Sequence, residues 1–491
     1  MKKDDLVTIE ITDYSTEGEG IGRADSFPLF VKDAVAGDTV ECRIMKLKKT
    51  YGYAKLIRVV KPSEDRVEAR CPKARPCGGC QMQELRYDAE LRFKTRKVRE
   101  ALRRIGGFEI AEDPSDADGR AVRVEDCVGM DDPWRYRNKA LVPFRTDREG
   151  RVIAGFYAGR THHIIEAEDC FLTPPEFAEI IREVKRHLSR YRIPVYNEET
   201  GTGLFRHLLI RKGFSTGEIL VCAVVNGEAL PCAERLYETL KGLLAARGLV
   251  LRSFTLNRNQ TPGNVILSPY TKTLFGDGFI EDSIGPVRFR ISPNSFFQVN
   301  PVMTRALYEK ALEFAGLTGT ETVWDLYCGI GSISLFLARK ARKVYGVEVV
   351  PQAISDARDN AALNGIVNAE FFVGKAEEVL PSWADAHPDE RIDVIVTDPP
   401  REGCDARCLD TMLRLAPDRI VYVSCDPATL ARDLKVLSGG GYRIERVQPM
   451  DQFAWTGHVE TVVLLSRKNI DDYLEVVWTD KEFGKKRDYS I

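Results

Sequence analysis

The stretch Thr322-Val-Trp-Asp325-Leu-Tyr-Cys-Gly329-Ile-Gly331-Ser332 decides the fold of the C-terminal part of this 491-residue chain. An apolar run typical of a buried strand ends in an acidic residue and a glycine loop, and a helix-length segment follows. The glycines let a ligand approach the backbone at the point where the strand becomes a helix. The stretch therefore predicts the first unit of a nucleotide-binding α/β fold.

Further strand-like runs follow this unit and alternate with helix-length segments. This alternation predicts a doubly wound, Rossmann-like parallel sheet. We expect strands at residues 322–327, 344–350, 370–373, 392–397 and 420–424, and helices at residues 332–343, 351–364 and 427–437.

The crevice at the carboxyl edge of this sheet is expected to hold a nucleoside-containing cofactor. Glu348 ends the second strand, where an acid can bind ribose hydroxyls. A dinucleotide fingerprint would have a third glycine, which is missing after Gly331. The pattern, together with the residues described next, favours S-adenosylmethionine over NAD; turn-forming glycines and a surface acid are the alternative.

The segment Val421-Tyr-Val-Ser-Cys425-Asp-Pro-Ala-Thr-Leu-Ala-Arg432 places a cysteine between a strand and a helix. Asp426 suits the N-cap and Pro427 the first helical turn. We expect the positive helix end to favour the thiolate of Cys425, so that it can act as a nucleophile. A buried cysteine packed behind the sheet is the alternative.

Two acidic residues are expected near this thiol. The fourth strand ends in Asp398-Pro-Pro-Arg401, and the position occupied by Arg401 is aromatic in amino-group methylases, so an exocyclic-amine substrate is disfavoured. In His458-Val-Glu460, strand alternation places His458 and Glu460 on one face. Glu460 can serve as a general base, and an edge-strand surface acid is the alternative.

Three closely spaced cysteines, Cys71, Cys77 and Cys80, indicate a metal site. Cys170 is a better candidate than Cys127 for a fourth ligand. Four thiolates suit either zinc or an iron–sulfur cluster, and the spacing alone does not choose between them. Cys42, Cys222 and Cys232 have apolar, strand-like neighbours and are expected in the core.

Residues 1–60 have the short strands and glycine turns of a small all-β barrel. From Arg43 to Lys61 all charged residues are basic, with Tyr51 and Tyr53 between them, which suits a phosphate backbone and stacked bases. The glycines, the Phe30-Val31 strand and the closing segment resemble a TRAM domain, an RNA-binding barrel. A solvated barrel face is the alternative.

Two further basic segments lie in the central part. Residues 91–104 place arginines at helical spacing beside Val98, Leu102 and Ile105, which indicates a solvated helix face. Residues 133–145 interleave aromatic and basic side chains without an acid, and we expect them to contact RNA.

Composition is that of a soluble globular protein, with a formal net charge of −2 and 44% hydrophobic residues. The N-terminus lacks the apolar region of a signal peptide, and no apolar run reaches the length of a membrane span, so we expect a cytoplasmic protein. We expect domains at residues 1–60, 61–270 and 271–468, followed by a tail, residues 469–491, without an assigned role.

Taken together, these motifs resemble the bacterial RNA uracil-5-methyltransferases, most closely those of 23S ribosomal RNA. The resemblance covers the chain from the barrel to about Lys468 and includes Tyr136-Arg-Asn-Lys-Ala140 and Phe297-Gln298-Val-Asn300. It implies a class I methyltransferase domain after an α+β domain that holds a [4Fe–4S] cluster. It also implies site roles: Cys425 as nucleophile, Glu460 as proton acceptor, Gln298, Tyr327, Glu348 and Asp398 at the S-adenosylmethionine site, and Cys71, Cys77, Cys80 and Cys170 as cluster ligands.

The expected reaction is methylation of a uracil C5 after Cys425 adds to C6, with a base flipped out of its stack. We expect a monomer that acts on 23S ribosomal RNA; the T-loop of transfer RNA is the alternative substrate. An RNA cytosine-5-methyltransferase, an iron–sulfur nicotinamide oxidoreductase and a non-catalytic RNA-binding protein are the other candidates. Asp426 departs from the asparagine common in relatives, and its charge is expected to oppose thiolate formation somewhat.

Overall fold

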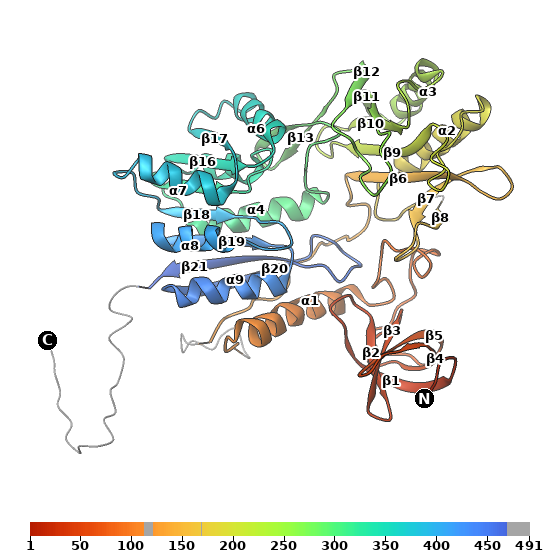
Figure 1. The fold of residues 1–491 in the computed structure, drawn as a ribbon, viewed down its shortest axis with the longest axis horizontal. Helices are drawn as coiled ribbons and strands as arrows, with labels where there is room; N and C mark the ends of the chain where they lie inside the picture. Colours follow the sequence, from red (N-terminus) through yellow and green to blue (C-terminus); the bar gives the residue numbers. More distant parts are fainter. Residues whose placement is uncertain (112–120, 168, 469–491) are drawn as a thin grey trace.

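The computed structural model describes residues 1–111, 121–167 and 169–468, which form a barrel, a central sheet and a C-terminal sheet with helices on both faces (Figure 1). The tail, residues 469–491, lies outside the described residues. No helix in the described part of the chain is long and apolar enough to cross a membrane.

The N-terminal strands close into a five-stranded barrel, as the sequence predicts. Alternate residues of its strands, such as Ile9 and Ile11, are buried inside. A Cβ on Gly22 would lie 2.5 Å from the carbonyl oxygen of Glu10, so only glycine lets β1 and β2 approach this closely. The strands, in the order β1-β2-β3-β5-β4, are β1 (Leu6–Tyr14), β2 (Gly20–Ala24), β3 (Phe27–Lys32), β4 (Thr39–Leu47) and β5 (Gly52–Lys61).

The central part is a seven-stranded sheet in the order β12-β11-β10-β9-β6-β7-β8, with two packed helices. The last of its strands in the chain begins at Thr271, beyond the expected border at residue 270. The strands are β6 (Lys139–Thr146), β7 (Val152–Tyr157), β8 (Ile164–Glu166), β9 (Phe205–Lys212), β10 (Glu218–Val225), β11 (Val250–Arg258) and β12 (Thr271–Gly276); the helices are α2 (Pro175–Arg190) and α3 (Ala233–Ala245).

The C-terminal sheet has the order β17-β16-β15-β18-β19-β21-β20. The five predicted strands are confirmed as β15 to β19 and are parallel, whereas β21 is antiparallel to both of its neighbours. The sheet contains β15 (Thr322–Leu326), β16 (Lys343–Glu348), β17 (Ala369–Val373), β18 (Val394–Thr397), β19 (Arg419–Ser424), β20 (Tyr442–Met450) and β21 (Glu460–Arg467).

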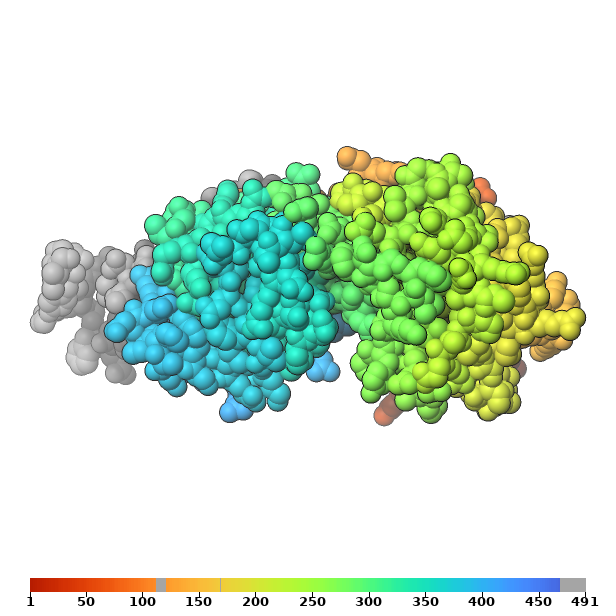
Figure 2. Space-filling model, turned by 90° about the horizontal axis from the view of Figure 1, so that it is seen from above, coloured from red at the N-terminus to blue at the C-terminus, as the bar shows by residue number. Residues whose placement is uncertain are grey.

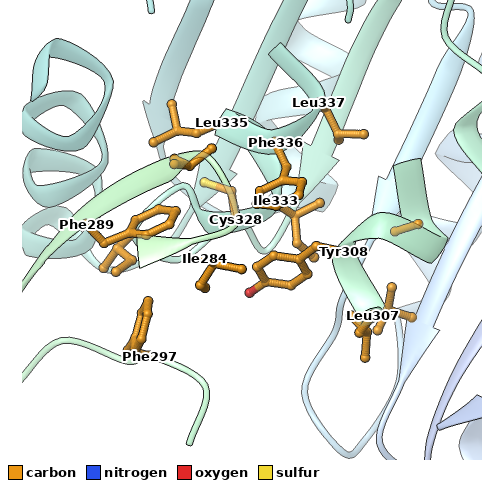
Figure 3. Packing of buried hydrophobic residues seen from close by; sticks show 14 of the residues in the cluster. Ile284, Phe289, Phe297, Leu307, Tyr308, Cys328, Ile333, Leu335, Phe336 and Leu337 are labelled. Carbon is orange, nitrogen blue, oxygen red and sulfur yellow. The ribbon is translucent and has the colours of Figure 1, made fainter. Parts of the chain in front are cut away.

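Helices cover both faces of this sheet, and a short hairpin packs beside it. In Figure 3, Ile284 of the hairpin faces Tyr308, and Phe289 lies above Phe297 within the same apolar cluster. The elements are the hairpin β13 (Ile280–Ile284) and β14 (Val287–Ile291) and the helices α4 (Pro301–Ala315), α5 (Ser332–Ala338), α6 (Pro351–Leu363), α7 (Ala376–Ala386), α8 (Ala406–Leu415) and α9 (Pro427–Gly439).

The chain segment before the central sheet packs on the C-terminal sheet. Helix α1 (Tyr87–Ala101) and the π-turn η1 (Leu102–Gly106) contact α9, and Val124 bridges to Val447 of β20. The predicted apolar stripe is buried here at Val98 and Leu102, while Ile105 stays 45% exposed. This segment therefore belongs spatially with the C-terminal sheet, although the sequence groups it with residues 61–270.

The central and C-terminal sheets form two lobes that lie side by side, with a notch between them on the face shown in Figure 2. In Figure 1 the barrel lies below the central sheet, next to the start of α1. Several parts of the chain therefore lie near the carboxyl ends of the parallel strands, where the predicted site residues are found.

Candidate active site

The turn after β15 forms one wall of the crevice at the carboxyl edge of the sheet. Tyr327, Gly329 and Gly331 all have positive φ values, of 65°, 55° and 78°. At Gly331 a Cβ would lie 3.1 Å from the Phe371 ring, so the turn after β15 packs tightly against a side chain of β17. The glycine loop predicted from the sequence is confirmed.

Beside this turn is a pocket of about 730 Å³ that suits a nucleoside-sized ligand. Tyr327 and Glu348 both line it, as do Lys375 and Pro400. Glu348 ends β16, and its carboxylate accepts the Val350 N–H at 2.9 Å. Two of the four residues assigned to the cofactor therefore share one pocket.

The other two assigned residues lie outside the lining of that pocket. Asp398 follows β18, and Gln298 lies in the segment before α4. Asn138 holds this segment by donating to the Gln298 carbonyl oxygen at 2.9 Å, while its own N–H donates to Val299 at 2.8 Å. Gln298 is thus positioned by the central part of the chain, a contact that its sequence neighbours do not reveal.

Two carboxyl groups with raised pKa values, the buried Asp325 and the half-buried Asp398, lie at the ends of β15 and β18. Burial raises the pKa of Asp325 to about 7 and that of Asp398 to about 6. The Asp325 carboxylate accepts a hydrogen bond from Ser334. Such perturbed acids in a cleft are typical of functional sites.

Cys425 lies between β19 and α9, half-buried, as the sequence predicts. Asp426 is the N-cap of α9, and its carboxylate accepts the N–H groups of Ala428 at 2.8 Å and Thr429 at 3.2 Å. The carboxylate is thereby bound to the helix end, as a cap requires.

Glu460 is the first residue of β21 and is only 5% exposed. Ser424 and Thr461 lie opposite each other in the antiparallel pair β19 and β21. Cys425 follows Ser424 and Glu460 precedes Thr461, so these two residues lie on the same side of that pair. β21 lies between β19 and β20, so the surface-acid alternative for Glu460 is wrong. His458 precedes the strand, and the predicted strand alternation of His458 and Glu460 is also wrong.

The local charges oppose the predicted thiolate. Burial, followed by the carboxyl groups of Glu460 and Asp398, raises the pKa of Cys425 to about 11. Burial and Asp398 raise the pKa of Glu460 to about 8. The expected thiolate is therefore wrong for the free protein, because the expectation omitted the burial of the thiol and the charges of Glu460 and Asp398.

Arg401 is the cation that counteracts these acids. Its charge lowers the pKa of both Cys425 and Glu460, against the larger effect of burial. The side chain is exposed, and the Arg401 carbonyl accepts a hydrogen bond from Thr429 of α9 at 3.1 Å. The sequence showed Arg401 in its motif but gave no sign of this electrostatic role.

The four cysteines assigned to a cluster line one cavity of about 270 Å³. They are Cys71, Cys77, Cys80 and Cys170. Cys127 lies elsewhere, buried in the core beside α1. Within the described ranges, no three His, Cys, Asp or Glu side chains are arranged to hold a single metal ion.

Of the three cysteines expected in the core, Cys42 and Cys222 are buried there. Cys232 is exposed, so its expected burial is wrong. It precedes α3 with a φ of 56°, and this turn brings it to the surface instead of continuing an apolar strand.

The basic and aromatic segment at residues 133–145 is largely engaged within the protein. Arg135 pairs with Asp169 at 2.6 Å, Trp134 stacks on Trp455 at 4.5 Å, and Phe144 is 2% exposed. These contacts contradict the expectation that the segment presents its side chains to RNA. The sequence could not show that the partners come from residues far along the chain.

The barrel retains a surface suited to nucleic acid. Tyr51 and Tyr53 form a ring cluster with Phe30, with centroid separations of 5.5 to 5.7 Å. Strands β4 and β5 and the turn between them also carry the exposed basic residues Arg43, Lys46, Lys48, Lys49, Lys55, Arg58 and Lys61, of which Arg58 pairs with Glu41.

Comparison with known proteins agrees with this architecture. The chain matches the family described as tRNA (uracil-5-)-methyltransferase over residues 280–468 and the TRAM domain over residues 5–57. It is 47% identical to an uncharacterized RNA methyltransferase of Halalkalibacterium halodurans, over 96% of this chain and 98% of that protein. An uncharacterized RNA methyltransferase of Clostridium acetobutylicum is 45% identical, over 95% of this chain and 98% of that protein.

A solved structure also resembles the whole chain. The tRNA (uracil-54, C5)-methyltransferase of Pyrococcus abyssi, in complex with S-adenosyl-L-homocysteine, superposes with a TM-score of 0.74 at 27% identity. The match covers 94% of this chain and 100% of that one. The fold and the site thus define an RNA methyltransferase with an N-terminal TRAM domain. Within that class, the chain belongs to the RNA uracil-5-methyltransferase family.

Proposed function

We propose that this protein methylates C5 of a specific uridine in RNA, with Cys425 as nucleophile and Glu460 as proton acceptor. The observation that carries the proposal is the pairing of β19 with β21, which sets this thiol beside a buried carboxyl group at the cofactor crevice. A carboxyl group is costly to bury, and Glu460 is only 5% exposed.

The chemistry requires a nucleophile because uracil C5 is a weak carbon nucleophile. The Cys425 sulfur adds to C6, which places an enolate at C5 for methylation. Glu460 then accepts the C5 proton, the C6–S bond breaks, and the thiolate is released with 5-methyluridine as product. With a pKa of about 8 this carboxyl group is mostly protonated at neutral pH, and once ionised it is a stronger proton acceptor than an ordinary glutamate.

The methyl group would come from S-adenosylmethionine. The pocket lined by Tyr327 and Glu348 has the size and the acidic edge expected for its nucleoside part. We assign Asp398 and Gln298 to the same donor, and Asp398 lies near enough to Cys425 and Glu460 to raise the pKa of both. The P. abyssi structure, which contains S-adenosyl-L-homocysteine, supports this choice of donor.

We also propose a [4Fe–4S] cluster held by Cys71, Cys77, Cys80 and Cys170. These thiols surround one cavity instead of converging on a point, which suits a cluster better than a single zinc ion.

Two basic side chains support a negatively charged occupant of that cavity. Arg137 and Lys139 line it, and neither forms an ion pair with a described acidic residue. The Arg137 Nε is buried without a hydrogen-bond partner in the described part of the chain. A cluster carrying four thiolates would compensate these charges, which are otherwise costly to bury.

For the RNA, the resemblance of the motifs favours 23S ribosomal RNA. The P. abyssi enzyme acts on uracil 54 of transfer RNA, which supports transfer RNA as the second candidate. In both cases the TRAM domain, with its exposed lysines and tyrosine cluster, would bind the RNA next to the flipped base.

The test is methyl transfer from labelled S-adenosylmethionine to 23S ribosomal RNA and to transfer RNA, each made without modified bases. We expect label in 5-methyluridine at one position of one RNA. Label on cytosine, or no label on either RNA with the cluster-loaded protein, would overturn the proposal. Iron and sulfide analysis of anaerobically purified protein tests the cluster; a zinc-containing, colourless protein would contradict it.

A further inference from the structure

The loop between β20 and β21, residues 451–459, leads directly into Glu460 and is held by one face of α1. Glu90, Lys94 and Lys97 share this face, because they are four and three residues apart on the helix. Each binds the backbone of a different loop residue. Glu90 accepts the Trp455 N–H at 2.8 Å, Lys94 donates to the Phe453 carbonyl at 3.1 Å, and Lys97 donates to the Gly457 carbonyl at 2.7 Å.

Buried charges fix this arrangement. Lys94 is fully buried and forms ion pairs with Glu90 at 2.7 Å and with Asp451, the first loop residue, at 2.5 Å. The Tyr87 hydroxyl donates to the other Asp451 oxygen at 2.7 Å. Apolar side chains would stabilise such a core at least as well. The ionic network adds a defined orientation of α1 against the loop, which apolar contacts do not give.

The turn between β1 and β2 of the barrel contacts the same loop from another side. Lys97 also donates to the carbonyl of Thr16, in the turn between β1 and β2, at 2.8 Å. A Cβ on Gly457 would lie 3.0 Å from that same carbonyl oxygen and 3.0 Å from the carbonyl carbon of Glu17. The loop therefore fits between α1 and the barrel turn without space for a side chain at residue 457.

We propose that Lys94 and Lys97 are positioning residues for Glu460: they clamp loop 451–459 between α1 and the barrel and so hold the carboxyl group beside Cys425. This inference rests on the proposed roles of Cys425 and Glu460. Because Lys97 joins the barrel turn to the loop, the position of the RNA-binding barrel and the position of the Glu460 carboxyl group are coupled. Neither lysine touches the reacting atoms.

The test separates positioning from folding by following the covalent protein–RNA adduct. Lys97→Met and Gly457→Ala, which act on the same contact from opposite sides, should slow elimination of the adduct at least ten-fold. S-adenosylmethionine affinity should stay within two-fold of wild type. The pH midpoint of elimination should move below that of the wild-type protein, because a looser loop admits water to Glu460.

Two further variants complete the experiment. Lys97→Arg keeps the donor and should restore most of the elimination rate. Arg92→Met, on the exposed face of the same helix, should behave as wild type. Wild-type elimination in both Lys97→Met and Gly457→Ala would overturn the inference, as would a slowed elimination that Lys97→Arg does not restore. If Glu460→Gln itself accumulates no adduct, the proposed function fails. If Glu460→Gln accumulates the adduct but Lys97→Met and Gly457→Ala do not, only the positioning role fails.

Discussion

Cys425 and Glu460 lie side by side because Ser424 pairs with Thr461 across the antiparallel strands β19 and β21. The pairing has an electrostatic consequence, since the buried carboxyl group of Glu460 helps to raise the pKa of the Cys425 thiol to about 11. Burial is the largest cause of this shift, and the neighbour that we propose as proton acceptor adds to it, so the nucleophile stays protonated in the free protein. Because this pKa already includes the lowering effect of Arg401, ionisation then has to be assisted by bound RNA and methyl donor.

The first prediction concerns the division of roles between these two residues. Glu460→Gln should accumulate a covalent protein–RNA adduct, because the methylated intermediate loses its proton acceptor, with turnover falling about 10²- to 10⁴-fold. Cys425→Ala should form no adduct and no product. Denaturing gels with labelled RNA measure both. A wild-type elimination rate in Glu460→Gln would show that another group accepts the proton.

The second prediction concerns Arg401, whose charge lowers the pKa of the Cys425 thiol. Arg401→Met should raise that pKa and slow the alkylation of Cys425 by iodoacetamide at pH 8 several-fold. Arg401→Lys, which keeps the charge, should stay near wild type. Peptide mass spectrometry separates the thiols, and exposed Cys232 serves as an internal reference. Equal rates in the two variants would exclude an electrostatic role.

The outcome at this site shows what the sequence could and could not predict. The β19–Cys425–Asp426–α9 unit was predictable because every part is local: an apolar strand, a cap and a first-turn proline. The pKa of the thiol was not, because burial and the charge of Glu460 come from strand pairing over a long sequence distance.

The same division holds for the fold. The periodicity of residues 322–424 predicted five strands correctly, since each strand and helix has its own local signal. The packing of α1 on the C-terminal sheet carries no such signal, because its apolar stripe shows that a face is buried but not against what. For the same reason, Trp134 and Arg135 resembled an RNA-binding segment, although Trp455 and Asp169 bind them.

The third prediction concerns Asp426, which caps α9 through two backbone N–H groups. Asp426→Ala should destabilise the protein by about 1 kcal/mol, because both hydrogen bonds are lost. Asp426→Asn keeps the cap, so its stability should stay close to wild type, while the loss of a charge near Cys425 should speed alkylation of the thiol modestly. Urea unfolding and the alkylation assay measure the two effects. Slower alkylation in Asp426→Asn would contradict the expected effect of the charge.

The last prediction uses the pH dependence of stability. The pKa of Glu460 is about 8 in the folded protein, above the ordinary value of 4.5, so folding favours the protonated form. Its contribution to stability is fully present below pH 4.5 and is lost as the pH rises through 8. Glu460→Gln, which cannot ionise, should therefore become more stable than wild type by a few kcal/mol between these pH values, at up to about 1.4 kcal/mol per pH unit.

Urea unfolding of both proteins at pH 5, 7 and 9 measures this difference. Glu68→Gln, at an exposed position, is the matched control and should follow wild type at every pH. A constant difference between Glu460→Gln and wild type across the range would show that Glu460 titrates normally. In that case its basicity would be no greater than that of a surface glutamate, which would weaken its assignment as the proton acceptor.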